Sequence, residues 1–570
     1  MTLIYQRYIK TALNQERKED EKMKIKLNGK EITVSKPVRI TELFDNSGYK
    51  YQAAKVNNRL RELNYIIPGD CEIELLDLTS SSVSTIYQAT LRYVTAMAVK
   101  NIYPRARVHF NYSVSRSIFA TVSGLGHAFL DKNFKEIQAE IDRIVKADYP
   151  ITRHSFKKEE AEEYYKSIGA LDKVKVLKYR QEETVHVYEC NGYKNYMFGY
   201  MLPSTGYLTS YRLKLYAPGF VMQYPRSECK GQLPEFHDEQ VFRAALKEAN
   251  IWANTAKSES IPQMNEIVES GRALEFINIC EARHNRQLAN LGQKIQDNIE
   301  TIRLICVAGP SSSGKTTFTN RVRIELKSRG IEPLMISMDN FYNPIEMAPK
   351  DEFGNPDLEH IEALDLELFD DVIFRLIQGE EVKLPTYDFK TKSRTFGDPV
   401  KITSRQPILI EGIHGLNDRI APSIPDDEKF KIYIAPLGQY KIDDHNPISI
   451  SDIRLIRRMV RDHQFRGTGC EKTLASWQSV RNGEFRWIYP YQNNANFVFN
   501  SELSYELCVL KKYAVPLLEE VPSDSPNYIT ANRLLKFLKY FQEISDKWIP
   551  CNSILREFVG NSIFYTEDTK

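Results

Sequence analysis

The sequence predicts a multidomain chain that begins with α+β units and ends in an α/β unit built on a parallel sheet with helices on both faces. Two observations support this prediction. The chain has 570 residues, 42% of them hydrophobic, which is enough for three or four domains at the usual ~100–200 residues each. Alternating apolar and polar runs typical of strands lie near its start, and a strand, a glycine-rich loop and a helix-compatible stretch follow one another from Leu304.

The first unit is predicted over residues 23–78. In "KIKLNGKEITV" two alternating runs flank Asn28-Gly29, which is a strong signal for a two-residue hairpin. A short helix near "ITELFDNSG" and strands in "AAKVNNRLRELNYII" and "GDCEIELLDL" complete an order typical of a β-grasp fold. Residues 1–22 form a polar tail, so that translation from Met1 or from Met23 is compatible with the pattern.

Charge is distributed unevenly along the chain. Residues 23–225 carry a net charge of +8 and residues 226–570 carry −7. This division is compatible with a front half that binds a polyanion such as RNA, and equally with chance unevenness on solvated faces. No run of ~18 apolar residues and no secretory pattern is present, so we expect no membrane span and a cytoplasmic protein. The sequence is compatible with a monomer or an oligomer.

The stretch "GPSSSGKT" fits the phosphate-binding pattern G-x-x-x-x-G-K-[ST] in full and predicts a P-loop domain that binds a nucleotide with Mg²⁺. ATP is the expected phosphate donor, and the choice between ATP and GTP is left open. The glycines let backbone N–H groups turn toward phosphates, Lys315 reaches the outer phosphates, and the Thr316 hydroxyl ligates the metal. An N-K-x-D sequence, which reads guanine in GTPases, is absent. The predicted nucleotide-binding residues are Gly309, Ser311, Ser312, Ser313, Gly314, Lys315, Thr316 and Thr317.

Two acids follow predicted strands of the same sheet. Asp339 ends "EPLMISMD" and Glu411 ends "QPILIE". Because parallel strands present their carboxyl ends at one edge of a sheet, we expect both acids beside the phosphate-binding loop. Such a pair divides the work: one carboxylate receives a hydroxyl proton and the other holds the metal through water.

A basic helix is predicted in "DIRLIRRMVRDHQFRG". Arg454, Arg457, Arg458 and Arg461 are spaced i, i+3, i+4, i+7, so they share one helical face, and Arg466 lies just beyond. After a phosphate-binding core, such a stripe is expected to act as a lid that offsets charge on the transferred phosphoryl group.

The segments "GPSSSGKTTF", "ISMDNFY", "LPTYDF", "LIEG" and "RLIRRMVRDHQFRG" resemble, in this order, those of the uridine kinase/phosphoribulokinase family. The resemblance implies that Asp339 is the general base, with Lys315 and Arg461 as further catalytic groups and Glu411 with Thr316 at the metal. It implies substrate contacts at Glu359, Tyr387, Lys392, Arg458 and Arg466.

Two positions depart from the family pattern. Lys392 stands where uridine kinases place a base-reading histidine, and Thr468 stands where they have a further substrate arginine. An ammonium can only donate hydrogen bonds, whereas histidine both donates and accepts. The phosphoryl-transfer residues are thus retained, while the base specificity of the acceptor site is left open.

The front half, residues 23 to about 225, resembles the N-terminal part of threonyl-tRNA synthetases, in which a TGS domain precedes a second additional domain that acts on mischarged tRNA. "VNNRLRELNYIIPGD", "AVKNIYPRARV" and "MLPSTGYLTSYRLKLY" carry the resemblance. The family's quartet of histidines and cysteine falls on Ala89, Tyr93, Met197 and Met201, none of which is a good metal ligand or a general base. We therefore expect the hydrolytic chemistry to be absent and a groove for a tRNA end, or a plain scaffold, to remain.

These patterns divide the chain into a polar tail (1–22), a TGS-like domain (23–78), a synthetase-like editing-type domain (79–225), a helical connector (226–298), a kinase domain (299–522) and a helical C-terminal segment (523–570). The leading hypothesis is an ATP-dependent nucleoside kinase that converts uridine or cytidine to the 5′-monophosphate. One alternative is a kinase that acts on a nucleotide within RNA delivered by the front half, and another is a nucleotide-gated RNA-binding protein.

Overall fold

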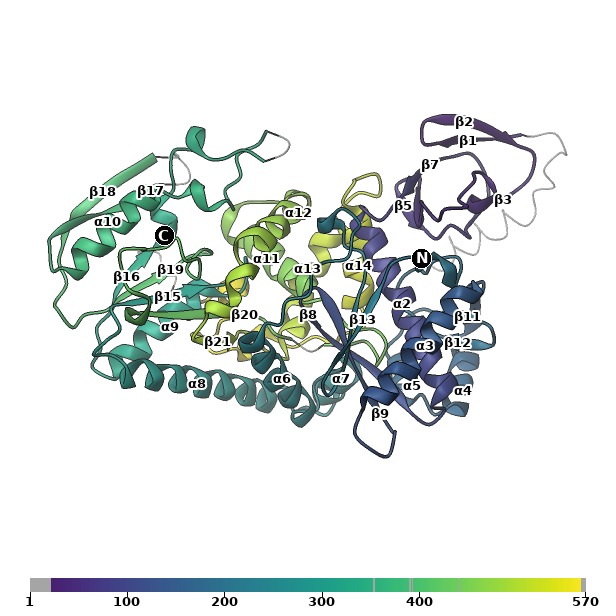
Figure 1. Cartoon of the computed structure of the whole chain (residues 1–570), viewed down its shortest axis with the longest axis horizontal. Coiled ribbons are helices and arrows are strands. Elements are labelled where there is room, and N and C mark those ends of the chain that lie inside the picture. The colour runs from purple at the N-terminus through teal and green to yellow at the C-terminus, as the bar shows by residue number, and fades with distance from the viewer. Residues whose placement is uncertain (1–21, 352–353, 389–390, 392, 439, 565–570) are drawn as a thin grey trace.

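The computed structural model describes residues 22–351, 354–388, 391, 393–438 and 440–564. Figure 1 shows a small sheet unit standing off at one end, a helix-rich block beside it, and a parallel sheet with its helices at the opposite end. The mixed α/β character and the parallel sheet agree with the predicted fold class.

The first unit is a five-stranded mixed sheet in the order β2-β1-β7-β4-β5. The predicted hairpin is confirmed: β1 (Met23–Leu27) pairs antiparallel with β2 (Lys30–Val34), and Asn28 and Gly29 both have positive φ, as a type I′ turn requires. The helix expected near residue 41 is a single 3-10 turn, η1 (Ile40–Glu42). The other strands are β3 (Val38–Arg39), β4 (Ala53–Val56), β5 (Arg59–Arg61), β6 (Ile66–Ile67) and β7 (Cys71–Leu76).

The second unit surrounds helix α2 (Ser81–Ile102). Small and apolar residues occur on all sides of this helix, which explains why it is buried along most of its length. It packs on α3 and on the antiparallel sheet β13-β14-β9-β8, and a second sheet, β10-β11-β12, lies beyond. The bounds are β8 (Arg107–Val114), β9 (Ser117–Ser123), α3 (Asp131–Ala147), β10 (Thr152–Lys157), α4 (Lys158–Ser167), α5 (Leu171–Lys178), β11 (Thr184–Cys190), β12 (Tyr193–Asn195), η2 (Thr205–Tyr207), β13 (Arg212–Tyr216) and β14 (Gly219–Gln223).

The third unit is built on five parallel strands in the order β16-β19-β15-β20-β21. Its central strand, β15 (Leu304–Ala308), is wholly buried, as the continuous apolar run predicts. The other strands are β16 (Leu334–Ser337), β19 (Ile408–Glu411), β20 (Lys429–Ala435) and β21 (Phe497–Asn500), with the hairpin β17 (Val382–Asp388) and β18 (Ser393–Val400) at one side. The helices are α9 (Lys315–Ser328), α10 (Leu366–Ile377), α11 (Ile450–Arg466), α12 (Cys470–Trp487) and α13 (Glu506–Glu519), with short 3-10 turns η4 (Met338–Phe341), η5 (Ile345–Met347), η6 (Ile361–Ala363), η7 (Asp426–Glu428) and η8 (Tyr489–Asn494).

Helices before and after the third unit pack into its core. Ile277 of the preceding helix α8, Ile305 of β15, and Leu534 and Phe558 of the C-terminal residues belong to one hydrophobic cluster. Figure 1 shows α8 running along one edge of the molecule beneath the sheet. These elements are η3 (Ser227–Cys229), α6 (Gln240–Thr255), α7 (Ile261–Glu269), α8 (Ala273–Asp297), α14 (Tyr528–Leu538), η9 (Asp546–Trp548) and α15 (Arg556–Val559).

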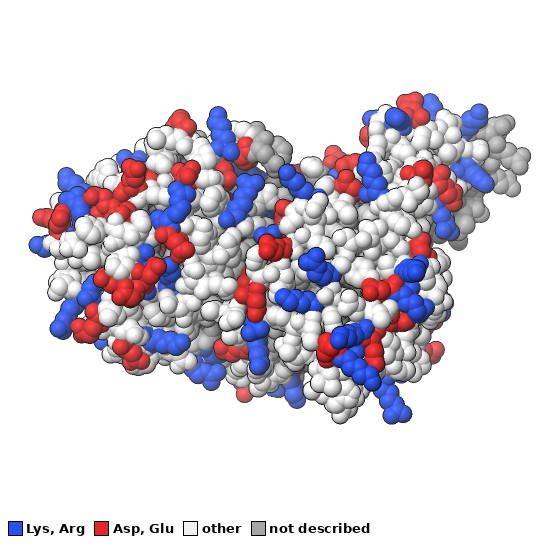
Figure 2. Space-filling model, viewed as in Figure 1, with Lys and Arg blue, Asp and Glu red and all other residues white. Residues whose placement is uncertain are grey.

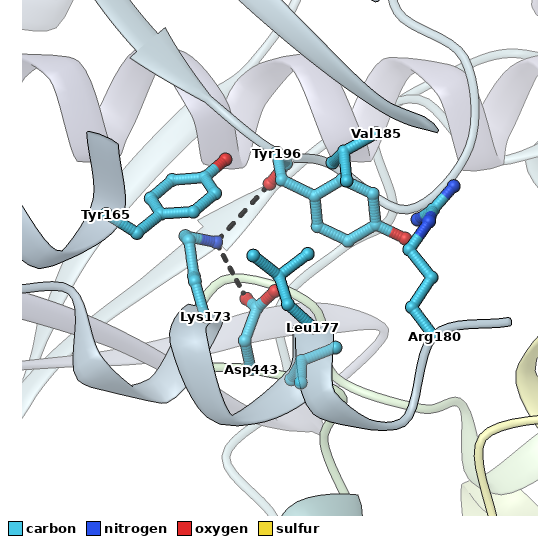
Figure 3. Close-up of a pocket in the computed structure, with 8 residues that line it drawn as sticks. Tyr165, Lys173, Leu177, Arg180, Val185, Tyr196 and Asp443 are labelled. Carbon is cyan, nitrogen blue, oxygen red and sulfur yellow. Dashed lines mark hydrogen bonds and ion pairs between the residues drawn. The ribbon is translucent and has the colours of Figure 1, made fainter. Parts of the chain in front are cut away.

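A polar joint connects the second and third units. The loop after β20 inserts residues 441–446 against the second unit, where Phe198 N–H donates to Asn446 Oδ1 at 2.8 Å. At the centre of the joint the Lys173 ammonium lies between the Asp443 carboxylate, at 3.1 Å, and the Tyr196 carbonyl (Figure 3). Lys173 and Asp443 are both buried, so the contact is an ion pair inside the molecule.

Candidate active site

The phosphate-binding loop lies between β15 and α9, as predicted. A Cβ on Gly309 would come within 2.1 Å of the Ile434 carbonyl oxygen, so only glycine fits there. Gly314 has a φ of +90°, in the left-handed region that glycine adopts without strain. Both glycines of the motif are therefore required by the local backbone.

The polar groups of the loop fit a phosphate. The Oγ atoms of Ser312 and Ser313 are buried, and among the described residues neither has a hydrogen-bond partner. Lys315 Nζ folds back and donates to the Pro310 carbonyl at 3.3 Å. Helix α9 begins at Lys315 and directs its first-turn N–H groups toward the loop, as in anion sites at helix N-termini.

The two predicted acids lie at the carboxyl edge of the sheet. Glu411 is the last residue of β19 and is paired in register with Ser337, the last residue of the neighbouring β16. Asp339 follows two residues later, in the turn η4. Thr316 Oγ1 lies 3.5 Å from both carboxylate oxygens of Glu411, so a hydroxyl and a carboxylate, oxygen ligands of the kind that Mg²⁺ prefers, face one another.

The charges at this edge influence one another. Burial raises the pKa of Glu411 to about 7; Asp339 adds to the rise and Lys315 opposes it. Desolvation by the surrounding protein also raises the pKa of Asp339, although its side chain is exposed, and Lys315 opposes this shift. Burial lowers the pKa of Lys315, and the two carboxylates counteract it. The structure therefore brings Lys315, Asp339 and Glu411 together.

The arginine helix differs from the expected lid. Arg454 and Arg457 of α11 are 1% and 0% exposed, so they form no part of a surface stripe. Arg454 Nε donates to the Ser311 carbonyl at 3.0 Å, and Arg457 Nη1 donates to the Ser312 carbonyl at 3.4 Å. Buried Glu484 and Glu506 pair with Arg454 and Arg457, respectively. Two of the four arginines in the predicted stripe, Arg454 and Arg457, thus support the backbone of the phosphate-binding loop.

The remaining arginines surround one carboxylate. Arg458, Arg461 and Arg466 contact Asp462 at 3.3, 2.9 and 3.7 Å, respectively. Arg458 Nη1 also donates to Ser311 Oγ at 2.8 Å, which places that guanidinium on the loop itself. Sequence reasoning missed Asp462, although its spacing of four residues from both Arg458 and Arg466 is the signal for such contacts on a helix.

The expected acceptor residues are brought together only in part. Burial raises the pKa of Glu359, and the nearby Arg458 and Lys315 oppose the shift, so this carboxylate lies near the loop. Tyr387 on β17 donates its backbone N–H to Asn340 Oδ1 at 3.3 Å, next to Asp339. Thr468 lies beyond the end of α11, where its hydroxyl donates to the Arg466 carbonyl and its N–H donates to the Asp462 carbonyl. Lys392 lies outside the described residues.

A further acid reaches the loop from the C-terminal residues. Glu557 of α15 accepts a hydrogen bond from the Thr317 N–H at 3.1 Å. The two residues are 240 positions apart, so no sequence spacing could have predicted the contact.

The second unit has apolar core at the four positions of the synthetase quartet. Ala89, Tyr93, Met197 and Met201 are all at most 2% exposed and belong to one hydrophobic cluster. The Tyr93 hydroxyl donates to the Tyr193 carbonyl at 2.7 Å. Over the described residues, no group of three or more His, Cys, Asp or Glu side chains is arranged to hold a metal ion, and no helix is long and apolar enough to cross a membrane.

The parallel sheet, its glycine-rich loop and the acids at its carboxyl edge define an α/β domain of the P-loop kinase class. Residues 304–505 match the model of the Phosphoribulokinase / Uridine kinase family. A uridine kinase from Oceanobacillus iheyensis is 28% identical over 34% of this chain and 84% of its own length, and one from Borrelia duttonii is 29% identical over 35% and 85%.

The front half matches a different group of enzymes. A threonine–tRNA ligase from Aquifex aeolicus is 27% identical over 34% of this chain but only 31% of its own length. The chain thus spans about a third or less of the ligases that it matches. It combines a segment that matches the kinase family model with a segment similar to these ligases, as the sequence motifs predicted.

Proposed function

We propose that the third unit is an ATP-dependent kinase that transfers a phosphoryl group to the hydroxyl of a nucleoside-like acceptor, most simply the 5′-hydroxyl of uridine or cytidine. The convergence of Asp339, Glu411 and Lys315 on one sheet edge is the observation that carries this proposal. A nucleotide sensor needs no carboxylate for an acceptor hydroxyl.

Each residue has a role in the proposed reaction. The loop N–H groups, Ser312, Ser313 and Lys315 hold the phosphates, and Thr316 and Glu411 hold Mg²⁺, which when bound neutralises charge on the phosphates. Asp339 accepts the proton of the attacking hydroxyl. Arg461, Arg458 and Arg466 stabilise the negative charge that spreads over the transferred group. Glu359 and Tyr387 orient the acceptor, and Lys392 stays a predicted contact.

A second candidate acceptor is a nucleotide within RNA. The front half is proposed to comprise a TGS-like β-grasp domain and an editing-type domain, with the boundaries predicted above. Where it meets α14, Arg61 lies over the Tyr65 ring and Arg153 over the Tyr200 ring, an arrangement suited to stacking unpaired bases. Burial lowers the pKa of Lys536 on α14, and Arg153 and Arg61 lower it further, so cations gather there. On the face drawn in Figure 2, by contrast, both signs of charge are interspersed.

Labelling distinguishes the candidate acceptors. The protein is incubated with γ-labelled ATP and Mg²⁺ together with a nucleoside panel or with total tRNA. Label in a nucleoside supports the leading proposal, and label in RNA supports the second. If neither takes up label while RNA is retained on a filter, the nucleotide-gated RNA-binding hypothesis is favoured.

The general base is tested by Asp339→Asn. The amide cannot accept the proton, so we expect turnover to fall by about 10²-fold or more while the affinity for ATP is retained. Asp371→Asn, on the exposed side of α10, is the matched control. Unchanged turnover in Asp339→Asn would falsify the catalytic assignment.

A further inference from the structure

The C-terminal residues Cys551–Gly560 are held firmly beside the phosphate-binding loop. Ser553 Oγ donates to Glu281 Oε1 of α8 at 2.5 Å. Arg556 Nη2 donates to the carbonyls of Ile549 and Asp546 at 2.6 and 3.0 Å. The short helix α15 packs along α11, the helix whose arginines support the loop.

This segment presses directly on the loop. A Cβ on Gly314 would come within 2.5 Å of Ile554 Cγ2, so the segment and the loop backbone are in close contact. Arg457, which donates to the loop carbonyls, has its guanidinium 5.1 Å from the centre of the Phe558 ring. The loop is therefore contacted by the arginines of α11 and, at Gly314, by Ile554 of the C-terminal segment.

The same segment places a carboxylate on the start of α9. The N-cap of α9 is Gly314, which has no side chain that could accept from the first-turn N–H groups. Glu557 supplies an acceptor to Thr317 N–H at 3.1 Å, and both residues are buried. Glu557 also acts on Lys315, together with Glu411 and Asp339.

A bound nucleotide needs the groups that Glu557 engages. In phosphate-binding loops the first-turn N–H groups and the lysine hold phosphate oxygens. A carboxylate oxygen and a phosphate oxygen cannot both take the Thr317 N–H at hydrogen-bond distance, and two anions at such a distance repel each other.

We propose that the segment Cys551–Gly560 is an autoinhibitory strap. Its Glu557 carboxylate occupies a phosphate position of the loop, and this carboxylate must move away when a nucleotide binds. This inference rests on the proposed function to the extent that the loop binds a nucleotide. Nucleotide affinity is then set partly by a residue that contributes nothing to the transfer itself.

The strap is tested in the full chain by Glu557→Gln. The amide keeps an oxygen that can accept from Thr317 N–H and removes the charge, so we expect the Kd for Mg-ATP, measured by calorimetry, to fall by about tenfold, or about 1.4 kcal/mol. Glu543→Gln removes the same charge from an exposed position between α14 and η9 and should leave the Kd unchanged. An unchanged or higher Kd for Glu557→Gln would show that Glu557 is only a helix cap and overturn the proposal.

Hydrogen exchange provides a second readout. If the Glu557 carboxylate leaves the loop and loosens the strap, backbone amides of residues 551–560 in the wild-type chain should exchange faster with Mg-ATP than without it. Unchanged or slower exchange would overturn the strap. A protein that shows both effects but phosphorylates no acceptor retains the strap and loses the proposed function. A protein that phosphorylates an acceptor but shows neither effect retains the proposed function and loses the strap. A protein that binds no ATP would overturn both the strap and the proposed function.

Discussion

At the scale of single residues, the site depends on charges that the fold forces together. Glu411 and Asp339 lie at one sheet edge beside Lys315, and the surrounding protein makes each of them harder to charge than in water. A divalent cation and phosphates would relieve this arrangement, because they match the carboxylates and the lysine respectively. Ligand binding at this site is therefore expected to depend on pH.

The Glu411 carboxyl should confer opposite pH dependences on folding and on binding. Its pKa is about 7 in the folded protein against an ordinary value of 4.5, so the folded state holds the proton more tightly than the unfolded chain does. Through this group, stability without nucleotide rises as the pH falls from about 7 toward about 4.5, and is lost as the pH rises through about 7. Mg-ATP needs the charged carboxylate, so its affinity should increase between about pH 6 and about pH 8.

Calorimetric titration of Mg-ATP across this range measures the effect on binding. The wild-type Kd should fall by up to about tenfold as the pH is raised, because one pKa unit corresponds to a factor of ten in the charged fraction. Glu411→Gln should bind more weakly and with a flatter profile. An identical profile in the variant would mean that another group titrates.

At the scale of elements, two helices determine how the site is held. Helix α11 supports the phosphate-binding loop through buried arginines, and α12 lies against Glu359. The supporting contacts run to backbone carbonyls of the loop, so they hold its path without depending on its side chains.

Removing the Glu506 carboxylate, which pairs with Arg457, should destabilise the phosphate-binding loop. Glu506→Gln leaves the Arg457 guanidinium buried without its anion, and breaking a buried pair in this way typically costs about 3–5 kcal/mol. We expect a lower unfolding midpoint and at least about tenfold weaker ATP binding. Glu519→Gln, at the exposed end of the same helix α13, is the control, and a normal Kd in Glu506→Gln would show that the loop keeps its shape unaided.

Helix α12 approaches Glu359 through a glycine. A Cβ on Gly483 would come within 2.4 Å of Glu359 Cβ, so Gly483→Ala must displace the carboxylate that we assign to the acceptor. We expect the KM for the acceptor to rise by about tenfold, with the Kd for ATP unchanged. Steady-state kinetics with each substrate varied in turn separates the two. Equal effects on both substrates would place Glu359 outside the acceptor site.

At the scale of the whole molecule, the kinase-like and synthetase-like halves are joined by a buried ion pair and not by a flexible linker alone. Lys173 and Asp443 meet in the interior of the joint shown in Figure 3, where Asp443 also accepts from the Asn446 side chain. Burial of charge is costly unless it is paired, which gives the two halves a specific relative position.

Lys173→Met should therefore destabilise the joint strongly. It leaves the Asp443 carboxylate buried without its cation, and we expect a loss of about 3–5 kcal/mol in the first unfolding transition. Lys175→Met, on the same helix α5, removes an exposed pair with Glu266 and should cost at most about 1 kcal/mol. Urea unfolding of the two variants compares them directly. Equal losses would mean that the joint contributes little.

Much of this protein could be predicted from local patterns. The hairpin at Asn28-Gly29, the strand Leu304–Ala308, the phosphate-binding loop and the helix after it were all predictable, because turn residues and apolar periodicity act over a few neighbouring positions. The edge that collects Asp339 and Glu411 was predictable for a similar reason, since parallel strands all end on one side of a sheet.

Other features depended on residues that meet only when the chain is folded. The arginine spacing correctly placed Arg454 and Arg457 on one face with Arg458, but it could not show that Glu484 and Glu506 bury those two side chains. Likewise, Glu557 meets Thr317 across 240 residues, and Lys173 meets Asp443 across two halves that match different groups of enzymes. Periodicity specifies which side of an element is apolar or charged; burial and charge pairing are decided by the partner that tertiary packing brings to that side.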